Sequence, residues 1–174
     1  DTFAKVQKRQ FKYRNKIINI LGIAKGSGMI APNMATMLAY VFVDLPVSKK
    51  ILDIILTESI DDTFNSITVD GETSTNDTVI LFAINDSQER KISNKNDPRY
   101  SLLKNNIKSL MENLAQQIVM DGEGVSKFIT VNIKLAKTIS QAKKIAFAIG
   151  ESSLVKTAIS GGDPNWGRII QAIG

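Results

Sequence analysis

The 174-residue sequence contains no cysteine and no histidine. These two absences exclude a disulfide framework, a cysteine nucleophile, a serine–histidine–aspartate triad within the chain, and a structural zinc site. Acid–base chemistry must therefore use aspartate, glutamate, lysine, tyrosine or a terminal amine. A threonine that becomes N-terminal solves this problem locally, because its own α-amine has a pKa of about 7.7–8.0 and can accept the hydroxyl proton.

Long apolar runs are also absent. No stretch approaches the ~20 residues that a membrane-spanning helix needs, and the apolar run 37–43 stops at Asp44. No secretory signal opens the chain, so we expect a cytoplasmic protein without a membrane partner. The first residue is Asp1 rather than methionine, and we expect a fragment or a processed piece of a longer protein.

The net charge of +5 has a local origin. Residues 1–25 contain seven basic residues against Asp1, with three aromatic side chains among them. Such a segment could bind nucleic acid, but an exposed edge strand protected by lysines explains the same pattern. We favour the edge strand and expect no nucleic-acid partner, because no recognised binding module follows.

Hydrophobic periodicity predicts alternating strands and helices without repeats or linkers. Strands are expected over 16–21, 37–43, 67–69, 78–84 and 128–135, and helices over 48–60, 101–120, 140–149, 154–159 and from Pro164. Ser48 and Ser140 are the predicted helix N-caps, and Asp70-Gly71 predicts a turn. The expected fold is a single α/β domain spanning residues 1–174.

The stretch from Gly22 to Leu38 combines Lys25, three glycines, a proline and the Ala35–Thr36 step. It is not a Walker A loop, because the lysine precedes the second glycine instead of following it. Our hypothesis is that Thr36 is a nucleophile at the mouth of a strand, freed by cleavage of its own peptide bond. An ordinary threonine at a strand edge explains the same residues, so from the residues alone both interpretations stay open.

Several long, irregular strings resemble the ornithine acetyltransferase (glutamate N-acetyltransferase) family, and they occur in that family's order over nearly the whole chain. These strings are Asp1-Thr-Phe-Ala-Lys5, residues 22–38, residues 64–78, Asp121-Gly-Glu-Gly124, residues 154–158 and Asp163-Pro-Asn-Trp-Gly-Arg-Ile169. The resemblance implies a multilayer α/β/β/α sandwich, of which this chain would form a part.

The resemblance also implies an activity. The precursor would cleave itself between Ala35 and Thr36, so that residues 1–35 end an α-chain and residues 36–174 begin a β-chain of a heterotetramer. The freed Thr36 hydroxyl would take an acetyl group from N2-acetylornithine and pass it to glutamate in arginine biosynthesis, through an acetyl-threonine intermediate. No cofactor or metal is implied, and whether acetyl-CoA is a second acetyl donor stays open.

Two substrate-binding residues follow from the same resemblance. Lys25 would hold a substrate carboxylate, and Glu123, on a glycine-flanked turn, would contact the substrate amine. The alternatives are a solvated loop lysine and an ordinary turn acid. Packing near the site or between subunits is favoured for Trp166 and Arg168, and structural roles are favoured for residues 70–77.

The family's oxyanion-hole residues and its C-terminal pocket residues lie outside these 174 residues. We therefore expect weak or no transferase activity from the chain by itself. Two other functions are weighed beside the transferase. One is a related self-processing aminopeptidase or amidohydrolase that gives the acyl group to water, and the other is an inactive, truncated remnant.

Overall fold

A four-stranded sheet organises the protein, which a computed structural model describes over residues 1–31, 37–73, 77–84 and 88–174. The strands lie in the order β1-β2-β3-β4. The pairs β1/β2 and β2/β3 are antiparallel, and β3/β4 is parallel. Their bounds are β1 Lys5–Tyr13, β2 Lys16–Lys25, β3 Leu38–Val43 and β4 Thr78–Ala83. The predicted strands at 37–43 and 78–84 are confirmed.

The strand predicted over 16–21 is confirmed by β2, and the chain turns back on itself between β1 and β2. Arg14 adopts a left-handed backbone conformation with φ of 54° at this turn. β1 is one of the two edge strands of the sheet, as its lysines predicted.

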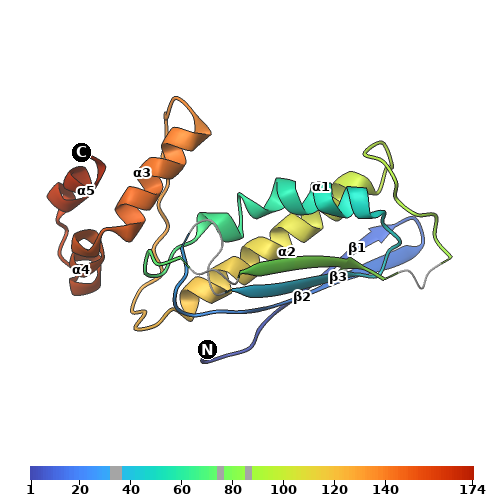
Figure 1. The fold of residues 1–174 in the computed structure, drawn as a ribbon, viewed down its shortest axis with the longest axis horizontal. Helices are drawn as coiled ribbons and strands as arrows, with labels where there is room; N and C mark the ends of the chain where they lie inside the picture. The colour runs from blue at the N-terminus through green and yellow to red at the C-terminus, as the bar shows by residue number, and fades with distance from the viewer. Residues whose placement is uncertain (32–36, 74–76, 85–87) are drawn as a thin grey trace.

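Two helices cover one face of the sheet (Figure 1). The helix α1 (Lys49–Ile60) begins at the predicted cap Ser48, whose hydroxyl accepts a hydrogen bond from the Ile51 amide. The 3-10 helix η1 (Phe64–Ser66) follows α1. The longest helix, α2 (Tyr100–Met120), confirms the prediction for 101–120. Its apolar stripe is fully buried against the sheet and comprises Leu103, Ile107, Leu110, Leu114 and Ile118. The helix layer on a sheet confirms the α/β fold class.

The opposite face of the sheet is apolar but not covered by any helix in the described part of the chain (Figure 1). Its partly exposed side chains include Leu21, Ile23, Ile80 and Phe82. Phe82 stacks on Phe42 with ring centroids 5.0 Å apart. An apolar face of this kind is what the expected multilayer sandwich requires for a further layer.

Three further helices form a group beyond one end of the sheet (Figure 1). They are α3 (Ile139–Glu151), α4 (Ser153–Gly161) and α5 (Trp166–Ile173). The predicted N-cap Ser140 is wrong, because Thr138 caps α3 by accepting a hydrogen bond from the Gln141 amide. The last helix begins at Trp166, not at Pro164. Lys156 ties the group to the rest of the chain by donating to the Val69 carbonyl at 2.7 Å.

Two predicted strands are absent from the described residues. Residues 67–69 are irregular, and the Val69 amide donates to the carbonyl of Ile30, which lies in a loop. Residues 128–135 are mostly exposed and pair with no described strand, although their residues alternate as in a half-buried strand. Alternation only makes a segment suitable for a sheet; a strand also needs a neighbouring edge to accept its backbone hydrogen bonds.

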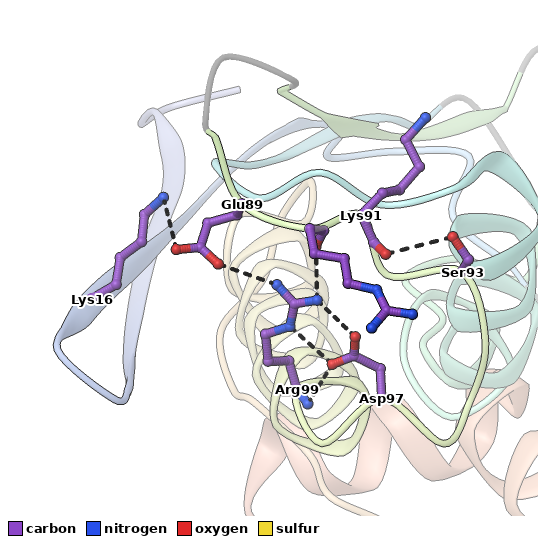
Figure 2. Close-up of polar contacts among 7 residues, drawn as sticks. Lys16, Glu89, Lys91, Ser93, Asp97 and Arg99 are labelled. Carbon is purple, nitrogen blue, oxygen red and sulfur yellow. Dashed lines mark hydrogen bonds and ion pairs between the residues drawn. The ribbon is translucent and has the colours of Figure 1, made fainter.

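A buried arginine anchors the start of α2, at the end of the sheet where β1 turns into β2. Arg99 is 5% exposed, and its guanidinium forms two hydrogen bonds to the Asp97 carboxylate, at 2.9 and 2.7 Å (Figure 2). Glu89 lies between Arg99 and Lys16, so the β1–β2 hairpin joins the same network. The hydrogen bonds from Arg99 hold the pKa of Asp97 below its usual value. This cluster lies at the opposite end of β2 from Lys25.

No helix in the described ranges is long and apolar enough to cross a membrane.

Candidate functional site

The register of the sheet brings the ends of three strands together. Lys25, the last residue of β2, pairs with Leu38, the first residue of β3, and Leu38 pairs with Thr78 at the start of β4. Neighbouring strands lie about 4.8 Å apart, so this row places Lys25 next to the start of β3. The predicted nucleophile Thr36 and its neighbour Ala35 lie outside the described residues. In the sequence, Thr36 is nevertheless only two residues before Leu38, the strand partner of Lys25.

A hollow of about 600 Å³ opens at this end of the sheet. Both predicted substrate-binding residues, Lys25 and Glu123, line it, although they are far apart in the sequence. The remaining lining residues are Asp1, Gly26, Ser27, Gly28, Met29 and Asp70. The structure therefore brings Lys25 and Glu123 to one cavity.

Glu123 is held against the loop that follows β2. It lies in the turn after α2, where Gly124 has a left-handed φ of 67°. The Glu123 amide donates to the Ser27 carbonyl at 3.1 Å. A Cβ atom on Gly28 would lie only 3.0 Å from Glu123 Oε1, so the missing side chain at Gly28 makes room for this carboxylate.

Asp70 holds the other side of the same loop. Its carboxylate accepts hydrogen bonds from the amides of Met29 and Ile30, at 2.6 and 3.0 Å. Met29 has a left-handed φ of 52°, a conformation that these bonds help to maintain. The predicted Asp70-Gly71 turn is confirmed, since Gly71 has a φ of 78° and the Glu72 amide donates to Asp70. Sequence reasoning missed the contact with the loop, because nothing local connects Asp70 to residues 29 and 30.

A buried ion pair secures the N-terminal segment beside the hollow. Lys5 Nζ lies 2.5 Å from Asp121 Oδ2, and both side chains are almost fully buried. The hydrogen bond from Lys5, followed by that from the Thr2 hydroxyl, holds the pKa of Asp121 far below its usual value. Lys5 thus departs from the solvated character expected for the basic residues of 1–25. The sequence contained one sign of this, since Lys5 and Asp121 each belong to a string that resembles the family.

Asp1 extends this anchoring to the loop. Its carboxylate lies 3.5 Å from Lys5 Nζ and accepts a hydrogen bond from the Gly26 amide at 3.2 Å. Gly26 has a φ of 144°, which favours glycine at the point where the chain leaves β2. Gly26, the residue after Lys25, is therefore fixed by β2 before it and by its hydrogen bond to Asp1.

The hollow is lined by one cationic side chain, Lys25, and by acidic side chains that include Glu123. A lysine ammonium can bind a carboxylate, and a glutamate carboxylate can bind an ammonium group. An α-amino acid carries both groups, so the hollow suits a ligand of that class. No cluster of three potential metal ligands is present in the described parts of the chain.

Trp166 and Arg168 do not line this hollow. Trp166 is 74% exposed, and Arg168 donates to the Leu154 carbonyl at 2.8 Å within the C-terminal helix group. A position between subunits stays a prediction for both residues.

The fold and the site together define a mixed α/β protein with a hollow of about 600 Å³ at one end of its sheet. Comparison with known proteins gives the family: the chain belongs to the ArgJ family, whose model matches residues 1–174. This result confirms the resemblance drawn from the sequence strings.

Two similar proteins and one solved structure share the name arginine biosynthesis bifunctional protein ArgJ. The arginine biosynthesis bifunctional protein ArgJ of Neisseria meningitidis serogroup A is 49% identical over 175 residues, and that of Bradyrhizobium diazoefficiens is 45% identical over 177 residues. Each match covers 100% of this chain but 43% of the relative, so the chain spans less than half the length of these proteins. The crystal structure of the Bacillus halodurans protein of that name matches with a TM-score of 0.73 and 41% identity, covering 80% of this chain and 65% of the other.

Proposed function

We propose that this chain is the part of a glutamate N-acetyltransferase of arginine biosynthesis that carries its self-cleavage site. The observation that carries the proposal is the hollow that Lys25 and Glu123 both line, beside the start of β3. The names of the relatives support the pathway, since each is described as an arginine biosynthesis protein.

The first step of the proposal is cleavage at Ala35–Thr36. The Thr36 hydroxyl oxygen attacks the Ala35 carbonyl carbon, the C–N bond breaks, and the nitrogen leaves as the α-amine of Thr36. Water then hydrolyses the resulting ester, which releases the Ala35 carboxylate and restores the threonine hydroxyl. The product is an N-terminal threonine whose own amine can act as base, in a sequence without cysteine or histidine.

The second step is acetyl exchange. The Thr36 oxygen attacks the acetyl carbonyl of N2-acetylornithine, and ornithine leaves after its nitrogen takes up the proton from the threonine hydroxyl. The glutamate amine then attacks the acetyl-threonine ester, which returns the proton to the threonine oxygen and yields N-acetylglutamate. Lys25 binds the α-carboxylate of either amino acid, and Glu123 orients the nitrogen that leaves or attacks.

The rest of the proposal concerns the whole protein. The relatives are named bifunctional, and we infer that acetyl-CoA is a second acetyl donor. We expect no cofactor. The α and β chains of one precursor associate as a heterotetramer in the cytoplasm. Residues 1–174 by themselves have little transferase activity, because the oxyanion-hole residues that the family resemblance implies lie elsewhere in the precursor.

The experiment uses a full-length precursor, meaning a polypeptide of the relatives' length that contains this chain. Intact mass should show fragments that end at Ala35 and begin at Thr36, and Thr36→Ala should remain whole. Cleavage at any other bond would overturn the proposal, and transfer of the acetyl group to water alone would favour the amidohydrolase.

Lys25→Ala and Glu123→Ala should each raise the KM for substrate by about tenfold or more, as expected for a lost charged hydrogen bond. Lys50→Ala, which removes an exposed lysine from α1, is the matched control and should not change KM.

A further inference from the structure

The carboxylate of Asp77 reaches the residue that directly follows Thr36. The Met37 amide donates a hydrogen bond to Asp77 Oδ1 at 2.5 Å. The next residue, Thr78, donates its own amide to the Met37 carbonyl at 3.0 Å. Asp77, directly before β4, and Thr78, its first residue, therefore bind both backbone polar groups of Met37, which is 3% exposed.

The environment of Asp77 is costly for a carboxylate. Its Oδ2 atom is buried and has no hydrogen-bond partner within the described ranges. Burial raises the pKa of Asp77, while the bond from the Met37 amide and the nearby charge of Lys25 act in the opposite direction. A buried polar atom without a partner costs free energy, and such a group in a native structure calls for an explanation.

The other carboxylate oxygen, Oδ1, has a defined role, because it accepts the hydrogen bond from the Met37 amide. The Met37 nitrogen and the Thr36 carbonyl carbon belong to the same planar peptide unit, so fixing the nitrogen fixes the unit that carries Thr36. A nucleophile must lie about 3–3.5 Å from the carbon that it attacks, in the correct direction. Asp77 holds the Met37 amide, which is the backbone nitrogen directly after the proposed nucleophile.

We propose that Asp77 is a positioning residue for self-cleavage at Ala35–Thr36: it accepts the Met37 hydrogen bond and so orients the peptide unit of the nucleophile. This inference rests on the proposed function. Asp77 does not touch the scissile bond in the proposal. It acts through Met37, and its effect should depend on an acceptor at the position of Oδ1, not on negative charge.

Three variants of the full-length precursor test this role. Asp77→Ala removes the acceptor and should slow cleavage by at least about tenfold, since misplacement by about 1 Å can cost up to about 100-fold. Asp77→Asn keeps an oxygen acceptor without charge and should cleave within about threefold of the wild-type rate. Asp77→Glu keeps the charge but moves the oxygen by one methylene group, and should be slowed by about tenfold. Asp53→Ala, on the exposed side of α1, is the matched control for loss of a carboxylate.

Cleavage is followed by intact mass over time, and the thermal midpoint of each variant is measured in parallel. If the wild-type precursor is not cut at Ala35–Thr36, the proposed function fails. If it is cut and Asp77→Ala is cut equally fast, the positioning role fails. Equal slowing of Asp77→Asn and Asp77→Ala would also overturn it, because charge and not an acceptor would then be required. If Asp77→Ala does not fold, Asp77→Glu decides the matter: slowed cleavage supports the role, and an unchanged rate refutes it.

Discussion

A methyl group at Gly28 should disturb substrate binding without unfolding the protein. The Cβ of Gly28→Ala would lie 3.0 Å from Glu123 Oε1 and 3.1 Å from the Glu123 carboxyl carbon. Both separations are shorter than ordinary van der Waals contacts, so the carboxylate must move by a few tenths of an ångström. Glu123 is exposed and can make this movement, and we therefore expect little change in stability.

The expected size follows from the hydrogen bond that Glu123 makes to the substrate amine in the proposed function. A hydrogen bond to a charged group contributes about 1.5–3 kcal/mol, and a small displacement should remove only part of it. A loss of about 1 kcal/mol corresponds to an increase in KM of about fivefold. Glu123→Ala removes the whole interaction and should have a larger effect than Gly28→Ala.

The assay measures the KM for N2-acetylornithine with the full-length protein, beside thermal midpoints. Gly161→Ala is the matched control, because a Cβ at that glycine would meet nothing within 4 Å. An unchanged KM for Gly28→Ala would refute the reasoning. A raised KM that is accompanied by a large fall in the melting temperature would refute it as well, since general destabilisation would then explain the effect.

Three further predictions concern stability. Gly22→Ala should lower the free energy of unfolding by about 1–3 kcal/mol in a denaturant titration, because its methyl group would overlap two buried leucines of α2; an unchanged midpoint would contradict this. Thr138→Ala should cost about 1 kcal/mol through loss of the α3 cap, whereas Ser140→Ala should cost nothing measurable, and equal losses would argue against the observed cap. Asp121 has a folded pKa lowered by Lys5, so its stabilisation is present above an unfolded pKa of about 3.9 and is lost as the pH falls towards the lower folded pKa. The melting-temperature difference between wild type and Asp121→Asn should therefore shrink below about pH 4, and a constant difference would contradict the assignment.

Local sequence patterns predicted the regular elements that a single segment can specify. The helix α2 follows from apolar residues at helical spacing, and β3 from a short, continuous apolar run. The same reasoning failed at 67–69 and 128–135, where the pattern was suitable but no described strand edge lies alongside. Pairing is a property of two segments, and one segment cannot reveal it.

The identities of Lys25 and Glu123 were available from the sequence strings, and so was the family. Their meeting in one hollow was not, because it depends on the sheet register and on where α2 ends. The roles of Asp70 and Asp77 were also hidden, as each reaches a main-chain amide about forty residues away.

The sequence by itself thus determined which chemical groups are present, which of them resemble a self-cleaving acetyltransferase, and which segments favour helix or strand. Tertiary structure decided which groups meet. Only the folded chain buries Lys5 against Asp121 and sets Asp77 against Met37. The physical reason is that propensity and periodicity act over a few residues, whereas ion pairs, sheet register and carboxylate–amide contacts join residues that only folding brings together.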